Sequence, residues 1–126
     1  MGLRATELEE ALMVIESLDG VFAICKVEDF SRLNLDAPFC FVGKTDCEHS
    51  LVCLSDDVPD NATAVDSGWR ALRVQGPLDL SLTGILAGIA DKLADAEIPL
   101  FAVSTFDTDY ILVKEEDFKR ALAILG

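Results

Sequence analysis

The stretch from Trp69 to Asp117 most restricts the folds open to this chain, because two hydrophobic periodicities alternate along it. Its longest apolar stripe has helical spacing and consists of Leu82, Ile85, Leu86, Ile89 and Leu93. That spacing places all five side chains on one face of a helix. Short β-rich runs flank the stripe, at residues 69–75, 100–105 and 110–114. With a second amphipathic helix over residues 115–125, the order strand, helix, strand, strand, helix predicts an α+β unit.

The first half of the chain resembles a shorter copy of this unit, with β-rich runs at residues 21–27, 39–43 and 50–54. Sliding the sequence along itself by about sixty residues matches several positions without a gap. The matched pairs are Pro38 with Pro99, Asp46 with Asp107, Glu48 with Asp109, Leu51 with Leu112, Val52 with Val113, and Asp56 with Asp117. Such a repeat indicates two tandem copies of one unit, the first without its long helix.

The unit itself has the pattern of a split βαβ, ferredoxin-like module, in which helices cover one face of an antiparallel sheet. We expect a first, degenerate module over residues 1–60 and a second over residues 69–126, the two sharing one core. Residues 61–68 are expected to form a linker between them, because turn-forming residues gather there.

The charge of the chain excludes one class of function. The net charge is −13, with −10 in residues 1–68 and −3 in residues 69–126. A protein that binds nucleic acid needs a basic face, which this composition does not provide. Solvation of the surface is the simpler explanation of the acidic balance, and a preference for cationic ligands is the alternative.

Neither a membrane span nor a secretion signal is visible in the sequence. The apolar runs are far shorter than a membrane span requires. Residues 1–10 lack the basic and then apolar regions of a signal peptide. We therefore expect a cytoplasmic chain with no membrane partner.

Three of the four cysteines, Cys25, Cys40 and Cys53, lie in apolar runs, where a free cysteine behaves as a small buried hydrophobe. A zinc site from Cys40, Cys47, His49 and Cys53 is the alternative, but the spacing lacks a Cys-x-x-Cys pair. We expect no metal, no cofactor and, in a cytosolic chain, no disulfide.

Two polar segments of the second half carry the candidate chemistry. Residues 76–84 join a strand to a helix, and the backbone N–H groups that begin a helix favour an anion such as a carboxylate. Residues 104–109 are acidic and suit an ammonium or guanidinium group. If their strands are neighbours, the two turns face one crevice, which describes an amino-acid site. Alternatively, the first segment only caps the helix, and Asp107 and Asp109 are only turn residues.

Catalytic motifs are missing from the sequence. It contains no HExxH, P-loop, GxGxxG, GxSxG or CxxC motif, and its only histidine, His49, lies in a polar turn. Asp107 and Asp109 as an acid–base pair are a weak alternative, because no catalytic motif accompanies them. We therefore expect a protein that is not an enzyme.

The same segments resemble those of small bacterial proteins with tandem ACT domains, which are related to the ACT units of cytosolic arginine sensors. The resemblance rests on GPLDLSLTGI at residues 76–85 and STFDTDYILVKEED at residues 104–117, and it covers residues 69–122. In the first half it is thinner and rests on FAICKV, FCFVGKTD and SLVCL. It implies two ACT-like βαββαβ modules, regulatory binding of an amino acid, and homo-oligomers formed through sheet edges.

The resemblance also implies where a ligand would bind, at the turn between the first strand and the first helix, often between two modules. On this sequence the implied residues are Gly76, Leu78, Asp79, Ser81, Leu82, Thr83 and Gly84. The facing turn adds Ser104, Thr105, Phe106, Asp107 and Asp109. The ligand of the sensors is arginine, and these acidic side chains are compatible with a cationic amino acid.

This chain departs from the family pattern in one respect, because no strand follows its last helix. The strand-like run at residues 11–17 is a candidate to fill that edge of the sheet.

The function we expect is that of a sensor whose ligand favours a closed arrangement of the modules, which a separate protein partner then recognises. The alternative is a structural protein–protein interaction module with a vestigial ligand site.

Overall fold

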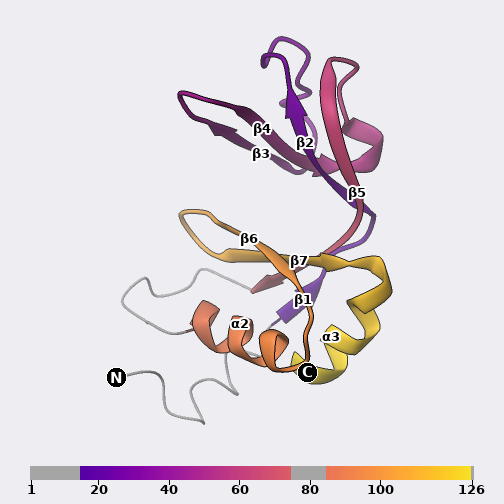
Figure 1. The fold of residues 1–126 in the computed structure, drawn as a ribbon, viewed down its shortest axis with the longest axis vertical. Helices are drawn as coiled ribbons and strands as arrows, with labels where there is room; N and C mark the ends of the chain where they lie inside the picture. Colours follow the sequence, from indigo (N-terminus) through magenta and orange to yellow (C-terminus); the bar gives the residue numbers. More distant parts are fainter. Residues whose placement is uncertain (1–14, 75–84, 126) are drawn as a thin grey trace. The chain divides into compact units, whose positions relative to one another are not determined.

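The computed structural model describes residues 15–74 and 85–125. They fall into two compact units, which we call the N-terminal unit (residues 20–69) and the C-terminal unit (the described parts of residues 1–19 and 70–126). The elements, in chain order, are β1 (Ile15–Ser17), β2 (Phe22–Val27), β3 (Cys40–Lys44), β4 (His49–Leu54), η1 (Ser55–Asp57), β5 (Ala62–Val74), α2 (Ile85–Asp95), β6 (Leu100–Ser104), β7 (Asp109–Lys114), η2 (Glu115–Asp117) and α3 (Phe118–Leu125), as Figure 1 shows.

The sheet of the C-terminal unit has the strand order β1-β5-β7-β6. Strand β1 pairs antiparallel with the end of β5, so that Ile15 lies opposite Val74 and Ser17 opposite Leu72. Helices α2 and α3 lie on the same side of this sheet (Figure 1). The arrangement confirms the predicted ferredoxin-like module, and β1 fills the edge for which the sequence offers residues 11–17 as a candidate.

The core of the C-terminal unit lies between the sheet and the two helices. Alternate residues of β5 and β7 face it, because side chains of a strand point to opposite faces in turn. The buried side chains in this core are Leu72, Val74, Ile89, Leu93, Ile98, Ile111, Val113, Phe118, Ala121 and Leu125. The stripe predicted for α2 is confirmed at Leu86, Ile89 and Leu93, while Leu82 and the side chain of Ile85 lie outside the described part. The last helix begins at Phe118 after a 3-10 turn, three residues later than predicted.

Arg70 holds β1, β5 and α3 together. Its guanidinium carbon lies 4.1 Å from the centre of the Phe118 ring, at the start of α3. Its Nη2 donates a hydrogen bond of 3.4 Å to the carbonyl of Leu18, just after β1. The Leu18 N–H in turn donates to the carbonyl of Ala71 at 3.0 Å. A cation over an aromatic face is attractive, so these contacts fix the N-terminal strand on a sheet made otherwise of the last part of the chain.

Helix α2 ends in a Schellman motif, which is the usual reason for a residue with positive φ at this place. The Ile98 N–H bonds the carbonyl of Leu93, and the Glu97 N–H bonds the carbonyl of Ala94, both at 2.9 Å. Glu97 therefore has a φ of 58°, and it is the one non-glycine residue of the described part with positive φ. The turn ends the helix before Pro99, which the chain then reaches in an extended conformation.

Glu97→Gly is expected to stabilise the protein by about 0.5–1 kcal/mol, because glycine adopts the left-handed conformation without a steric cost. Urea unfolding followed by circular dichroism measures the change. Glu97→Ala is the matched control, since it removes the carboxylate and keeps the backbone strain. Equal stabilisation by alanine would mean that relief of charge, and not of φ, is the cause.

The N-terminal unit repeats the sheet without the helices. Its strand order is β3-β4-β2-β5, and all three pairings are antiparallel. Between its strands, the segment of residues 20–69 forms turns and the 3-10 helix η1, and it contains no α-helix. One cluster of buried side chains in this unit consists of Ala23, Cys25, Leu51 and Cys53, with Leu33, Cys40 and Val58 packed against it. The prediction of helices on one face thus holds for the C-terminal unit only.

The boundary between the units differs from the predicted one. Residues 62–68, where the sequence predicts a linker, belong to β5, which continues into the C-terminal unit. The turn-forming pair Ser67 and Gly68 lies at a shift in the β2–β5 register. Phe22 pairs with Trp69 and Ile24 pairs with Asp66, so β5 has one more residue between the two pairs than β2 has. Gly68 has a φ of 81°. An extra residue with positive φ makes a bulge within a strand, so the signal for a turn does not end β5.

The internal repeat is present in the structure with a different register. The matched residues in the sequence are 61 positions apart, whereas β3, β4 and η1 precede β6, β7 and η2 by 60. A slip of one residue exchanges the two faces of a strand. Leu51, which faces the core of its unit, therefore corresponds to the core residue Ile111 and not to Leu112.

Candidate functional site

The predicted site residues that the structure describes lie together in the turn between β6 and β7. They are Ser104, Thr105, Phe106, Asp107 and Asp109. The other predicted residues, Gly76, Leu78, Asp79, Ser81, Leu82, Thr83 and Gly84, lie outside the described part. The geometry of the candidate site therefore rests on the β6–β7 turn and on the end of β5.

Three hydrogen bonds shape the turn. Ser104 lies opposite Asp109 in the last pair of the β6–β7 ladder, and its Oγ donates to Asp109 Oδ1 at 2.6 Å. The N–H of Thr105 donates to the carbonyl of Thr108 at 2.9 Å, and the Thr105 hydroxyl donates to the same carbonyl at 3.1 Å. A carboxylate that accepts a short bond from a hydroxyl is held in one orientation, so the turn presents Asp109 in a defined position.

Thr108 connects this turn to β5. Its side chain is 7% exposed, and its hydroxyl donates a hydrogen bond to the carbonyl of Val74. Val74 is the last residue of β5 and lies two positions before Gly76. Strands β5 and β7 are neighbours, which is the condition that the sequence analysis sets for a site shared by the two polar segments.

Thr108 is one of the polar residues of the turn, but it is missing from the site residues that the family resemblance implies. A threonine inside a polar turn gives no periodic signal, and its burial depends on a strand more than thirty residues earlier in the chain. Only the pairing of β5 with β7 brings the two residues together.

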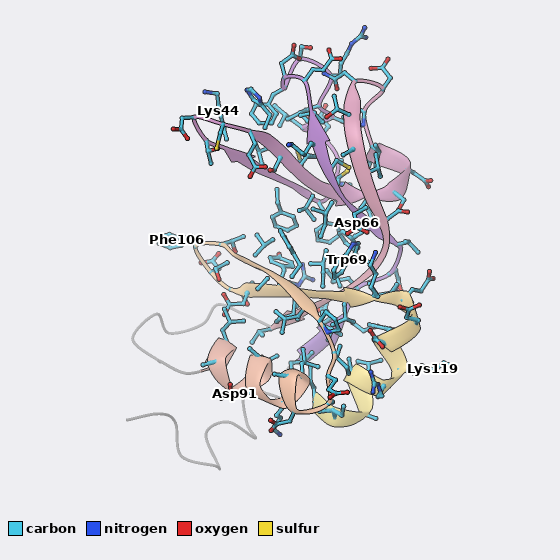
Figure 2. All side chains as sticks on the ribbon, in the orientation of Figure 1. Lys44, Asp66, Trp69, Asp91, Phe106 and Lys119 are labelled. Atoms are coloured by element: carbon cyan, nitrogen blue, oxygen red, sulfur yellow. The ribbon has the colours of Figure 1, made fainter. Side chains whose placement is uncertain are left out.

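The turn is acidic and open to solvent at its tip. Phe106 is 83% exposed and marks the tip of the hairpin in Figure 2, and Asp107 beside it is exposed as well. Asp109 is half-buried. No lysine or arginine occurs in residues 100–113. Two carboxylates without a cation in the same segment form a suitable pair of acceptors for an ammonium or guanidinium group.

The equivalent turn of the N-terminal unit differs in charge. At an offset of 60 residues, Lys44 stands in the place of Ser104 and His49 in the place of Asp109. The ring of Phe30, from the loop after β2, lies edge-on to the His49 ring with centroids 4.9 Å apart. The N-terminal turn therefore lacks the acceptor that Asp109 provides in the C-terminal unit.

The loop after β2 begins with a carboxylate residue, Asp29, that accepts several hydrogen bonds. Asp29 Oδ1 accepts the N–H of Ser31 at 3.0 Å and the hydroxyl of Ser31 at 2.5 Å. The amide nitrogen of Asn61 lies 3.3 Å from the same oxygen. The bonds from Ser31 hold the pKa of Asp29 below its ordinary value. The Asp29 carboxylate thus accepts hydrogen bonds from one backbone N–H and from the side chains of Ser31 and Asn61.

The cysteines do not form the zinc site that the sequence offers as an alternative. Cys40 lies opposite Cys53 in the β3–β4 ladder, while Cys47 is exposed in the turn beyond it. Within residues 15–74 and 85–125 no three potential ligand side chains gather to hold a metal ion. Cys25 and Cys53 are buried as predicted, and burial raises the pKa of the Cys53 thiol to about 12. These thiols stay protonated at neutral pH, which suits a role in packing.

Among the described residues, no helix is long and apolar enough to cross a membrane.

The chain belongs to the ACT domain family, whose model matches residues 64–126. It is 40% identical over 58 residues to the human cytosolic arginine sensor for mTORC1 subunit 1, a match that covers 45% of this chain and 18% of the sensor. The chain thus spans less than a fifth of the sensor's length. Both helices, strands β6 and β7 and the acidic turn fall inside the family match, whereas β1 lies outside it.

Solved structures show the same fold. The crystal structure of protein Atu0741 from Agobacterium tumefaciens is 32% identical with a TM-score of 0.75, and the match covers 88% of this chain and 84% of that one. The aspartate kinase of Clostridium acetobutylicum has a TM-score of 0.64 at 13% identity, and the match covers 88% of this chain and 33% of the kinase. At that identity the likeness concerns the fold alone. The protein is therefore an ACT-domain protein related to domains that sense amino acids.

Proposed function

We propose that this protein is a non-catalytic, cytoplasmic sensor that binds a cationic amino acid through its C-terminal unit. The observation that carries the proposal is the hydrogen bond between Thr108 and Val74, which places the acidic β6–β7 turn at the end of β5. In this proposal Asp107 and Asp109 bind the side-chain ammonium or guanidinium group. Ser104 orients Asp109, and Thr105 and Phe106 border the ligand.

The other half of the proposed site is the segment that follows Val74. Its residues Gly76, Leu78, Asp79, Ser81, Leu82, Thr83 and Gly84 are proposed to receive the α-carboxylate through backbone N–H groups. Arginine is the first candidate ligand, because the related human sensor carries arginine in its name and shares 40% identity over 58 residues. Because the turn is acidic, we expect it to bind an amino acid with a cationic side chain more tightly than a neutral one.

Regulation would follow from a shift between conformations. A ligand that binds one conformation more tightly raises its population by the difference in affinity, and a protein partner then recognises that conformation. We further propose that copies of the chain associate through sheet edges. Strand β6 is an edge of its sheet, and its five residues carry no charge. Phe101 on this strand is 36% exposed.

A panel of amino acids tested by thermal unfolding should separate this function from its rival. Ligand at about a hundred times its dissociation constant stabilises a protein by about 2.7 kcal/mol, which raises the melting temperature by several degrees. We expect L-arginine or L-lysine at millimolar concentration to give the largest rise. L-citrulline, which has the length of arginine without its charge, serves as the control ligand.

A flat response to the whole panel would contradict the proposed sensor. The exposed Phe106 and the uncharged edge of β6 would then favour the second candidate, a protein–protein interaction module with a vestigial ligand site. Stabilisation by citrulline equal to that by arginine would retain an amino-acid site and reject its preference for a cation.

A further inference from the structure

Thr108 is the single buried polar residue among the residues that the structure describes. Burying a hydroxyl is unfavourable unless it finds a hydrogen-bond partner. The partner here is the carbonyl of Val74 in a different strand. A valine would have nearly the same shape, so filling space alone does not explain a threonine at this position.

The bond from Thr108 joins two parts of the chain that local structure leaves independent. Within the turn, Thr108 accepts hydrogen bonds only from Thr105, three residues before it. Beyond the turn, its hydroxyl reaches β5, so a displacement of the turn relative to Val74 would break that bond. Asp107 and Asp109 are its covalent neighbours and move with it.

We propose that Thr108 is a positioning residue for the amino-acid site, which fixes the two neighbouring carboxylates relative to the end of β5 without touching the ligand itself. This inference rests on the proposed function, and it adds a residue whose effect on affinity is indirect. A binding constellation works only when its groups are held close to the productive geometry. Loosening the turn should therefore weaken binding although every ligand-contacting side chain is still present.

The N-terminal unit shows the same turn without this bond. Glu48 occupies the position of Thr108 at an offset of 60 residues, and it is exposed. There the first threonine of the turn, Thr45, accepts N–H bonds from Cys47 and Glu48 at 3.2 and 3.1 Å. That turn is thus stabilised within itself, whereas the C-terminal turn is bonded to a neighbouring strand. The turn that is bonded to a neighbouring strand is thus the one that contains Asp109, and the turn without that bond has His49 at the equivalent position.

The test compares Thr108→Val, which keeps the shape and removes the hydroxyl, with Thr108→Ser, which keeps the hydroxyl. Ile111→Val is the control for a general loss of packing, because Ile111 is fully buried in β7 and makes no side-chain hydrogen bond. Hydrogen–deuterium exchange of the amides at residues 104–109 is measured without ligand. The dissociation constant of L-arginine is then measured for each variant by calorimetry.

We expect Thr108→Val to speed exchange in the turn at least tenfold and to weaken arginine binding about tenfold. Thr108→Ser should restore both to within about threefold of the wild type, and Ile111→Val should leave the exchange of the turn unchanged. Unaltered exchange in Thr108→Val would overturn the inference. So would faster exchange with unaltered arginine affinity, because the bond would then be structural only.

The exchange measurement keeps this inference separate from the proposed function. If the wild type binds neither arginine nor any other amino acid of the panel, the sensor proposal fails, and with it the role of Thr108 in binding. Exchange then still decides whether Thr108 holds the turn. If Thr108→Val does not fold, the serine variant carries the test, since a loose turn in a variant that keeps the hydroxyl contradicts the proposed role.

Discussion

Leu72→Ala is expected to lower the free energy of unfolding by about 3–5 kcal/mol, which is the cost of removing a fully buried leucine from a packed core. Leu72 has no exposed surface, lies in the second part of β5 and faces helices α2 and α3. It also stands opposite Ser17, so the cavity would lie beside the pairing that holds β1. Urea unfolding monitored by circular dichroism measures the loss.

Val65→Ala is the matched control, because Val65 lies in the same strand but in the N-terminal unit and is 51% exposed. Substitutions at such positions change stability by less than about 0.5 kcal/mol. A loss below 1 kcal/mol for Leu72→Ala would contradict the core described for the C-terminal unit. Equal losses for the two variants would show that position in β5, and not burial, determines the cost.

Asp109→Asn is expected to weaken the binding of L-arginine by about thirty- to a hundredfold, or about 2–3 kcal/mol. The substitution keeps the shape of the side chain and its oxygen for the Ser104 hydroxyl, which lies 2.6 Å from Oδ1. It removes the charge that a guanidinium group would meet. Calorimetric titration with arginine gives the dissociation constants, and the melting temperature without ligand shows that the fold is intact.

Asp91→Asn controls for the general charge of the unit. Asp91 is exposed on the side of α2 that faces away from the sheet (Figure 2), and its substitution changes the net charge by the same amount. We expect it to alter arginine affinity less than twofold, since separated surface charges are screened by salt. Equal weakening by both variants would assign the effect to the overall field and remove Asp109 from the site.

The elements of the C-terminal unit could be predicted because each one depends on residues close in sequence. The stripe of α2 at Leu86, Ile89 and Leu93 follows from helical spacing. Burial of Ile111, Leu112 and Val113 follows from the continuous apolar run that they form within a predicted strand. Both patterns can be read from neighbouring residues alone.

Two errors in the sequence prediction concern segments that lie far apart in the sequence. Turn-forming residues at 61–68 predict a linker, but pairing with β2 keeps residues 62–68 in β5 and absorbs the turn as a bulge at Gly68. Matches 61 positions apart suggest a repeat, but the equivalent strands of the two units lie 60 positions apart. For the predicted linker, hydrogen bonding to a neighbouring strand outweighs the local preference for a turn.

Hydrophobic spacing and the quoted motifs are enough to predict the family resemblance, the ferredoxin-like pattern and the acidic turn. The pairing of β1 with β5 and the bond from Thr108 to Val74 are known from the folded structure. The sequence offers residues 11–17 only as a candidate for the edge of the C-terminal sheet, because a strand edge and a backbone carbonyl accept any segment with suitable geometry. Which segment arrives there is decided by the packing of the whole unit, and that packing is what brings the acidic turn to the end of β5.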